Sequence, residues 1–247
     1  MCRLLAVVSA VPQPLAVSLG DLLPGFTALS SFHQDGWGIA AGSQSRMVLA
    51  KAPRRALDDP AFSAALSSTV TDAGLIHIRW ATPGFGLCTG NTHPFVYGQM
   101  AFAHNGSAEP VQAIWDQVDA DLRQDVEGST DSEAYFRAVL TRMRRADPPD
   151  ALIQAASAIR SVTAISGLNA MLLTQDALYV YADHDADSPA SRRHGPDYFP
   201  IRYQRRAGSV VVSSTGYEPV NLQWQQLPQR HVLRVGRADL DVQVFGD

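Results

Sequence analysis

The chain has 247 residues, of which 46% are hydrophobic and 18% are charged, the balance of an ordinary globular protein. Its formal net charge of −4 argues against a general nucleic-acid binder, because such proteins present a basic face. No stretch approaches the apolar run of about 18 residues that a membrane span needs. Only two cysteines are present, too few for a disulfide framework. These properties favour a cytoplasmic protein that needs neither disulfide nor metal for stability.

Short apolar runs predict strands in an early and a late group. The run at 4–9 follows Cys2 and is closed by Pro12 and Pro14, so we interpret it as a buried strand rather than as a weak signal peptide. The other runs of the early group lie at 37–41, 47–50, 75–80 and 100–104, and those of the late group lie at 170–174, 178–182, 210–214, 232–235 and 241–245.

Helical spacing of apolar residues dominates the middle of the chain. It predicts helices at 60–68, 110–121, 131–145 and 149–162. The order of strands, helices and strands again differs from the regular alternation of a Rossmann sheet and favours an α+β layered architecture. We expect one domain over residues 1–247, because no repeat or linker divides the chain. The polar segment 183–196 is expected to form an exposed, mobile loop.

Cys2 is a candidate nucleophile because of its position. The thiolate is the reactive form of cysteine, and a free thiol with a pKa of about 8.5 needs a base. Removal of Met1, which a small second residue favours, would expose an α-amine on the same residue, with a pKa of about 7.7–8.0. One residue would then supply both nucleophile and general base. The alternative is that Cys2 merely begins a strand.

Arg79 ends a run that reads as a buried strand, where an unpaired guanidinium is costly. Its planar fork suits a carboxylate ligand, and a structural salt bridge is the alternative. The chain continues through Trp80, Ala81 and Thr82 into Pro83-Gly84-Phe85-Gly86. Glycines on both sides of Phe85 indicate a loop that moves or approaches a ligand closely.

Two further segments carry candidate ligand-binding groups. Asn105-Gly106 follows an apolar strand and is a hairpin signal, but its side-chain amide and backbone N–H can also stabilise an oxyanion. Such a donor contributes roughly 3–4 kcal/mol in acyl transfer. Thr130 and Glu133 match a capping box, which leaves Asp131 near the helix start, able to face a ligand ammonium.

In this order, the motifs resemble the glutaminase domain of class II glutamine amidotransferases, the N-terminal-cysteine members of the Ntn-hydrolase superfamily. The resemblance covers at least residues 2 to about 140. The chain is similar to stand-alone members, such as the ergothioneine-pathway γ-glutamyl hydrolases, in its length, in its first residues Met-Cys-Arg-Leu-Leu and in its Asp-Gly-Trp-Gly segment. The matching segments are Met1-Cys2, Asp35-Gly36-Trp37-Gly38, Arg79-Trp80-Ala81-Thr82, Asn91-Thr92-His93-Pro94, His104-Asn105-Gly106 and Thr130-Asp131-Ser132-Glu133.

The resemblance implies a fold and a set of reacting groups. The fold is a four-layer αββα sandwich of two antiparallel sheets, which agrees with the α+β order of the predicted elements. Cys2 would act as nucleophile and, through its amine, as base. Asn105 and Gly106 would stabilise the oxyanion.

The resemblance also implies how the substrate is held. Arg79, helped by Thr82, would bind the α-carboxylate of a glutamine or γ-glutamyl group, and Asp131 would receive its α-ammonium. Trp80 would shape the pocket or its lid. Larger family members often have His directly after the Arg-Trp-Ala-Thr segment, whereas this chain has Pro83, which bears on the carboxylate contacts.

We expect no cofactor and no metal. The amine leaves no need for a histidine base, so we expect structural roles for His77, His93 and His104. The segment containing Asp183, His184, Asp185 and Asp187 is open to interpretation as a metal site, but a loose acidic loop is favoured over it.

The expected reaction is hydrolysis of glutamine or a γ-glutamyl amide through a γ-glutamyl thioester, with release of ammonia or an amine. No phosphate-binding glycine loop or other synthase signature is present, so the protein either acts alone or passes ammonia to a separate synthase. One rival is a non-catalytic binder of an amino-acid-like ligand through Arg79 and Asp131. Another is an acylase that cleaves a different amide with the same nucleophile. We expect a small-molecule substrate and no nucleic-acid or membrane partner.

Overall fold

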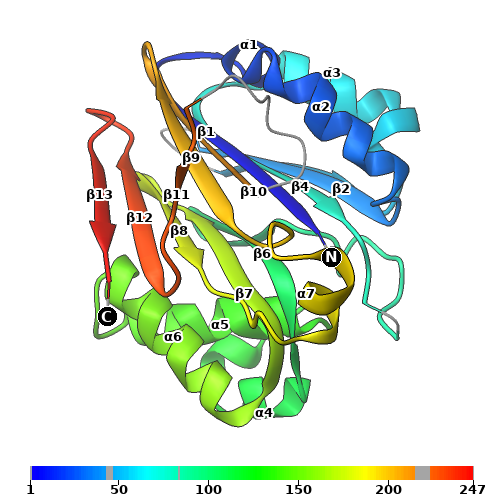
Figure 1. Cartoon of the computed structure of the whole chain (residues 1–247), viewed down its shortest axis with the longest axis vertical. Coiled ribbons are helices and arrows are strands. Elements are labelled where there is room, and N and C mark those ends of the chain that lie inside the picture. Colours follow the sequence, from blue (N-terminus) through cyan, green and yellow to red (C-terminus); the bar gives the residue numbers. More distant parts are fainter. Residues whose placement is uncertain (1, 43–46, 83, 215–222, 247) are drawn as a thin grey trace.

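Two antiparallel sheets lie face to face, and helices cover the outer face of each (Figure 1). The computed structural model describes residues 2–42, 47–82, 84–214 and 223–246. The expected four-layer αββα sandwich is confirmed. None of the described helices is long and apolar enough to cross a bilayer.

The first sheet has the strand order β11-β9-β10-β1-β4-β2-β3. β1 lies near its centre because the run that follows Cys2 is apolar and buried on both faces. The strand bounds are β1 (Arg3–Pro14), β2 (Gly36–Gly42), β3 (Met47–Ala52), β4 (Val70–Arg79), β9 (Ile201–Arg206), β10 (Ser209–Ser214) and β11 (Gln225–Gln226).

The second sheet has the order β13-β12-β8-β7-β6-β5. Its strands β6 and β7 pair along most of their lengths, with Asn105 beside Asn169. The bounds are β5 (Phe95–Tyr97), β6 (Met100–Glu109), β7 (Ala164–Leu173), β8 (Ala177–Ala182), β12 (His231–Gly236) and β13 (Val242–Phe245).

Each outer layer is a set of helices with one apolar face. The helices on the first sheet are α1 (Leu15–Leu19), α2 (Leu22–Ala28) and α3 (Pro60–Ser68), and those on the second are α4 (Val111–Trp115), α5 (Asp131–Met143) and α6 (Pro148–Val162). Three-residue and four-residue 3₁₀ turns lie at Leu29–Ser31, Ala56–Asp58 and Ala120–Arg123. The starts of α3 and α6 follow the sequence signal closely: an aspartate accepts a backbone N–H and proline occupies the first turn.

The core between the sheets consists of small and branched apolar side chains. Leu4 and Leu75 of the first sheet and Ala103 and Met171 of the second are fully buried there. Burial of these faces drives the sheets together, and it also fixes the strand register, because a one-residue slip would turn each apolar side chain outward.

The helix predicted at 110–121 is wrong in its extent. α4 ends at Trp115, and Asp119 has an extended backbone with ψ 142°. The Asp119 N–H donates to the Thr141 hydroxyl of α5 at 3.1 Å, so tertiary contact replaces the next helical hydrogen bond. The apolar spacing reflects packing onto α5 rather than one continuous helix.

The loop predicted at 183–196 is also wrong, because it contains α7 (Pro189–His194). Ser188 accepts the Ser191 N–H and Pro189 occupies the first turn, a start signal that the polar composition hid. Asp183 is buried and forms an ion pair with Arg160, whose Nε donates to it at 3.1 Å.

Helices α1 and α2 have no counterpart among the predictions. Pro24 and Gly25 are unfavourable helix residues, which obscured the pattern. Pro24 lies in the first turn of α2, where its missing N–H has no helical partner. Leu22 and Phe26 are buried on the outer face of the first sheet, so tertiary packing decides the conformation.

We expect Leu75→Ala to lower the free energy of unfolding by about 2–5 kcal/mol, because Leu75 is fully buried between the sheets. Val70→Ala is the matched control on the same strand, since Val70 is 61% exposed, and its effect should be within about 0.5 kcal/mol. Urea denaturation measures both. Equal effects of the two substitutions would contradict the assigned packing.

Candidate active site

The predicted site residues come together at one end of the sandwich. β1 pairs antiparallel with β4, with Arg3 beside Ile78, so this register brings Cys2 to the end of β4 at Arg79. β6 of the second sheet packs against both strands and carries Asn105 and Gly106. Residues far apart in the chain therefore meet where the two sheets face each other.

The Cys2 thiol is nearly buried, with 8% of the residue exposed. Its Sγ donates to the Trp80 carbonyl oxygen at 3.7 Å. Burial raises the pKa of the thiol above its ordinary value, while Arg79 lowers it and Asp131 raises it. Both charged groups therefore act on the sulfur, and the buried thiol needs a base to ionise. Met1 lies outside the described residues.

Asp35 fixes the turn that follows β4. Its backbone N–H donates to the Arg79 carbonyl at 3.1 Å, and its carboxylate accepts the Ala81 N–H at 2.8 Å. The carboxylate thereby holds the turn whose Trp80 carbonyl contacts the thiol. The sequence motif contains Asp35, but only the structure gives it this positioning role.

Arg79 is buried and faces the loop after Trp80. Both terminal nitrogens donate to the Gly86 carbonyl at 3.3 Å, and the Asn91 side-chain amide donates to the same oxygen at 3.2 Å. No acidic side chain pairs with Arg79 in the described part of the chain, so the salt-bridge alternative is wrong for these residues. The guanidinium retains N–H groups for a further acceptor. Pro83 lies outside the described residues.

Asn105 is fully buried, and neither its side-chain oxygen nor its nitrogen has a hydrogen-bond partner within the described residues. A buried unsatisfied amide costs about 1–3 kcal/mol, so its retention points to a partner that arrives with a ligand. The hairpin interpretation of Asn105-Gly106 is wrong, because β6 continues to Glu109. A Cβ on Gly106 would overlap the Gly167 carbonyl, so glycine is required for the close pairing with β7.

Asp131 lies buried at the start of α5. One carboxylate oxygen accepts the Ala108 N–H at 2.9 Å, and the positive end of the helix dipole favours the charge. Thr130 caps the helix as predicted, accepting the Glu133 N–H at 3.3 Å. Glu133 departs from a capping box, because its carboxylate accepts the Gly128 N–H instead.

The Asn91-to-Pro94 segment packs against the face of the first sheet at β2. A Cβ on Gly38 would overlap the His93 carbonyl, so glycine allows this segment to lie against β2. The Lys51 ammonium donates to the Thr92 carbonyl at 2.9 Å. The Asp-Gly-Trp-Gly and Asn-Thr-His-Pro segments are therefore coupled by packing.

A cavity of about 250 Å³ opens beside the Trp80 turn. Trp80 is 40% exposed and packs edge-on against His33 and His194. The cavity is lined by Trp80, Ala81, Thr82, Ser107, Pro189, Ala190, Arg193 and His194. Sequence reasoning missed the α7 residues, although Ser188-Pro189 is the signal that finds their helix.

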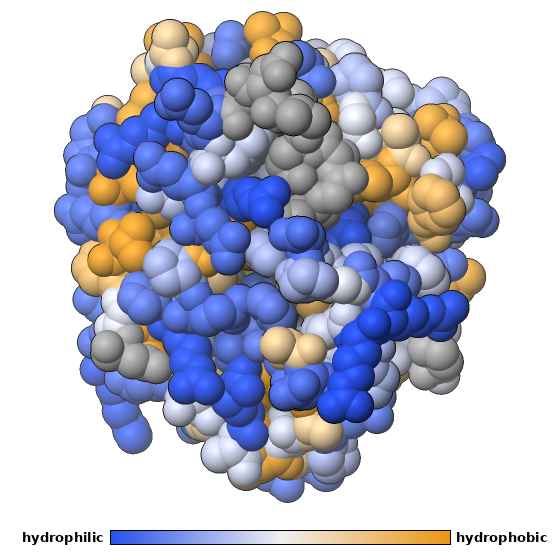
Figure 2. Space-filling view, in the orientation of Figure 1, coloured by the Kyte–Doolittle hydropathy of each residue, from blue (hydrophilic) through white to orange (hydrophobic). Residues whose placement is uncertain are grey.

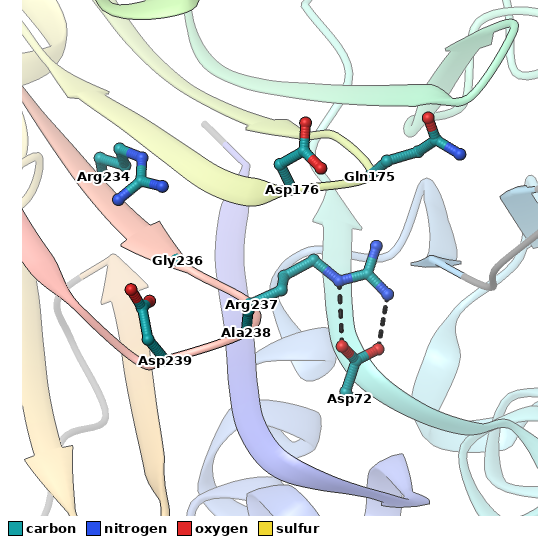
Figure 3. Close-up of a pocket in the computed structure, with 8 residues that line it drawn as sticks. All are labelled: Asp72, Gln175, Asp176, Arg234, Gly236, Arg237, Ala238 and Asp239. Carbon is teal, nitrogen blue, oxygen red and sulfur yellow. Dashed lines mark hydrogen bonds and ion pairs between the residues drawn. The ribbon is translucent and has the colours of Figure 1, made fainter.

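A larger cavity of about 420 Å³ lies at the opposite end of β4 (Figure 3). Its residue Asp72 is seven positions from Arg79, roughly 23 Å along the strand. The Arg237 guanidinium there is engaged by Asp72, with Nε at 3.1 Å, and by the Thr174 carbonyl at 3.1 Å. These contacts join the two sheets, and we assign no chemistry to this cavity.

Three buried histidines lie under the site. The rings of His77 and His93 are 4.2 Å apart between centroids. The Nε2 of His104 lies 3.0 Å from the Gly167 carbonyl, which only accepts, so Nε2 donates and Nδ1 accepts from the Ser132 hydroxyl at 2.9 Å. Burial lowers the pKa of all three, which keeps them neutral.

The metal interpretation of the acidic segment finds no support in this geometry. The Asp183 carboxylate forms an ion pair with Arg160, and the Asp183 backbone N–H donates to the Asn169 side chain of β7. Within the described ranges, no three His, Cys, Asp or Glu side chains are grouped closely enough to hold a metal ion.

The model of one protein family matches residues 1–198, and that model describes class II glutamine amidotransferases. The chain belongs to the class II glutamine amidotransferases. The resemblance found in the sequence motifs is thereby confirmed.

Solved structures of class II amidotransferases share this fold. A glutamine aminotransferase class-II domain protein from Silicibacter pomeroyi is 20% identical, with 99% of each chain covered and a TM-score of 0.71. Glutamine phosphoribosylpyrophosphate amidotransferase from B. subtilis is 18% identical, with 99% of this chain and 49% of that chain covered and a TM-score of 0.64. At these identities the likeness shows the Ntn-hydrolase fold.

A curated relative of this class II amidotransferase is the probable glutamine amidotransferase DUG3 of Saccharomyces cerevisiae. The two are 30% identical over 116 residues, which cover 43% of this chain and 32% of the relative. The chain thus spans about a third of that relative's length.

The buried histidines predict a pH-dependent stability. Burial is the main cause that lowers the pKa of His77 and His93, and neighbouring Arg79 lowers both further. A histidine whose folded pKa is lower than its unfolded pKa binds protons first in the unfolded chain. The free energy of unfolding is therefore fully maintained above the unfolded pKa of about 6.5 and falls as the pH drops below it, by up to about 1.4 kcal/mol per pH unit per histidine.

Urea midpoints between about pH 7.5 and pH 5.5 measure this dependence. His93→Gln should reduce the slope, whereas His231→Gln, on a partly exposed residue, should leave it as in the parent. A midpoint that stays constant over this range in the parent protein would contradict the prediction.

Proposed function

We propose that this class II amidotransferase hydrolyses the side-chain amide of glutamine or a γ-glutamyl compound, with Cys2 as the nucleophile. The observation that carries the proposal is the buried, unpartnered amide of Asn105 on the sheet that faces the Cys2 thiol. An acyl-transfer intermediate supplies what that amide lacks, an oxygen that gains negative charge as the reaction proceeds.

In the proposed mechanism, removal of Met1 frees the Cys2 α-amine, which takes the thiol proton. The thiolate attacks the amide carbon, and the resulting oxyanion accepts hydrogen bonds from the Asn105 side chain and the Gly106 N–H. The C–N bond then breaks, and the leaving amine takes the proton from the α-ammonium. Water attacks the γ-glutamyl thioester and releases glutamate and the thiol.

Two charged residues are proposed to hold the glutamyl group. Arg79 would bind the α-carboxylate with help from Thr82, and Asp131 would bind the α-ammonium. The absence of an acidic partner for Arg79 among the described residues supports the first role. Arg79 and Asp131 both shift the pKa of the Cys2 thiol, which supports their proximity to the proposed nucleophile. Trp80 shapes the entrance.

Transfer of ammonia to a separate synthase is the second candidate. The match to the B. subtilis phosphoribosylpyrophosphate amidotransferase covers only 49% of that enzyme, so half of it has no counterpart in the match. A stand-alone hydrolase turns over as purified protein. A glutaminase subunit would show little turnover until its partner is added.

We expect Cys2→Ala to abolish turnover of glutamine and of γ-glutamyl amides while circular dichroism stays that of the parent. Cys88→Ala is the matched control, because Cys88 is the exposed free cysteine and should be dispensable. Intact mass should show loss of Met1, and then an adduct with a diazoketone analogue of glutamine in the parent and in Cys88→Ala only. Full activity of Cys2→Ala would refute the mechanism.

We expect Asn105→Ala to lower kcat by about 10²–10³, the cost of removing one oxyanion donor. Its stability should be unchanged or higher, because the substitution removes a buried amide that has no partner. Asn169→Ala is the control, since that amide bonds to the Phe199 carbonyl and the Asp183 N–H, and it should lose stability. A large stability loss in Asn105→Ala with unchanged kcat would contradict the assignment.

A further inference from the structure

The cavity beside Trp80 adjoins the proposed reacting groups, and of Arg79, Thr82 and Asp131, the residues proposed to hold the glutamyl group, only Thr82 lines it. Trp80 carries the carbonyl that contacts the Cys2 thiol, and Ser107 follows Gly106 on β6. Neither Arg79 nor Asp131 lines the cavity. The cavity therefore has room for a part of the substrate that the glutamyl-binding residues leave unassigned.

The wall formed by α7 is fixed to the start of β1. The His194 ring stacks on the Tyr198 ring with 4.2 Å between centroids. The Arg3 guanidinium lies 4.3 Å from the centre of the Tyr198 ring, and its Nη1 donates to the Tyr198 carbonyl at 3.0 Å. Because Arg3 follows Cys2, the end of α7 is held in place relative to the nucleophile.

The same wall is basic. Arg193 and His194 line the cavity, and none of its lining residues in the described part of the chain carries a carboxylate. Arg192, on the same helix, lies outside the lining and has Asp187 as an ion-pair partner at 3.7 Å. Arg193 forms no ion pair within the described residues, so its guanidinium is available to a ligand. Strongly hydrophilic residues cover the surface where Figure 1 places α7 (Figure 2).

We propose that this cavity binds the leaving-group half of a γ-glutamyl amide and selects an amine that carries a carboxylate, as in a γ-glutamyl amino acid. The inference rests on the proposed function and names its substrate class. The scissile amide carbon must lie at the thiol with its glutamyl head toward Arg79 and Asp131, so the substituent on the amide nitrogen extends the other way. Arg193 then pairs with the carboxylate, and Trp80 packs against the rest of the amine.

The proposed step balances as a hydrolysis. The Cys2 sulfur forms a bond to the carbonyl carbon of the side-chain amide, the C–N bond of that amide breaks, and the amino acid leaves with the proton of the α-ammonium. Water then attacks the carbonyl carbon of the thioester, the C–S bond breaks, and glutamate and the free thiol are released. No oxidant, reductant or other co-reactant is needed.

The test compares kcat/KM for γ-L-glutamylglycine, its glycinamide analogue and L-glutamine with the processed parent protein. The first two probes differ only at the glycine end, which is a carboxylate in γ-L-glutamylglycine and a carboxamide in its analogue. We expect the parent to prefer the carboxylate by about tenfold, mainly through KM, and the preference to weaken at high salt. Arg193→Ala should bring the ratio of the two close to one.

Arg192→Ala is the matched control, because it removes a neighbouring arginine of the same helix that does not line the cavity, and it should keep the parent's ratio. Turnover of glutamine or the glycinamide probe without preference for the carboxylate would overturn the inference and leave the proposed function standing. Equal losses on both γ-glutamyl probes in Arg193→Ala would likewise overturn it. No turnover of any probe by protein that has lost Met1 would overturn the proposed function itself.

Discussion

The antiparallel pairing of β1 with β4 is the constraint on which the site depends. Leu4 lies beside His77 in this register, and its side chain is buried between the sheets. A slip by one residue would turn that side chain away from the core between the sheets and toward the helical layer, so packing of the hydrophobic core fixes the register. This register places the Cys2 thiol at the Trp80 carbonyl. The Asp35 carboxylate fixes the turn after β4 by accepting the Ala81 N–H. Core packing thus sets the position of a buried thiol.

The facing sheets contribute complementary halves of the site. The first sheet brings Cys2 and Arg79, the second sheet brings Asn105 on β6, and helix α5, which covers the second sheet, brings Asp131. These polar groups are buried, where interactions between charges are strengthened and unpaired groups are costly. Both polar atoms of the Asn105 amide lack a hydrogen-bond partner in the described structure, as do the ring nitrogens of His77 and His93 beneath the site. Natural proteins accept local costs of this kind mainly at functional sites.

The sequence predicted the layered α+β class and most strands, because apolar runs of strand length report burial directly. It failed where a distant contact decides local structure. Asp119 leaves the helical conformation because a hydroxyl on α5 accepts its N–H, and no pattern near 119 encodes that. α7 was hidden by polar composition, and with it the basic wall of the cavity at Arg193.

By itself, the sequence determined the chemical groups and their order along the chain: a cysteine at position two, an arginine ending a strand, an Asn-Gly pair and a capped aspartate. These are local properties, legible from residue type and spacing. Only the tertiary structure decided that the Cys2 thiol meets a carbonyl 78 residues away, that Arg79 faces Gly86, and that the Asn105 amide lacks a partner. Such relations depend on strand register and on the packing of one sheet against the other, which no local pattern specifies.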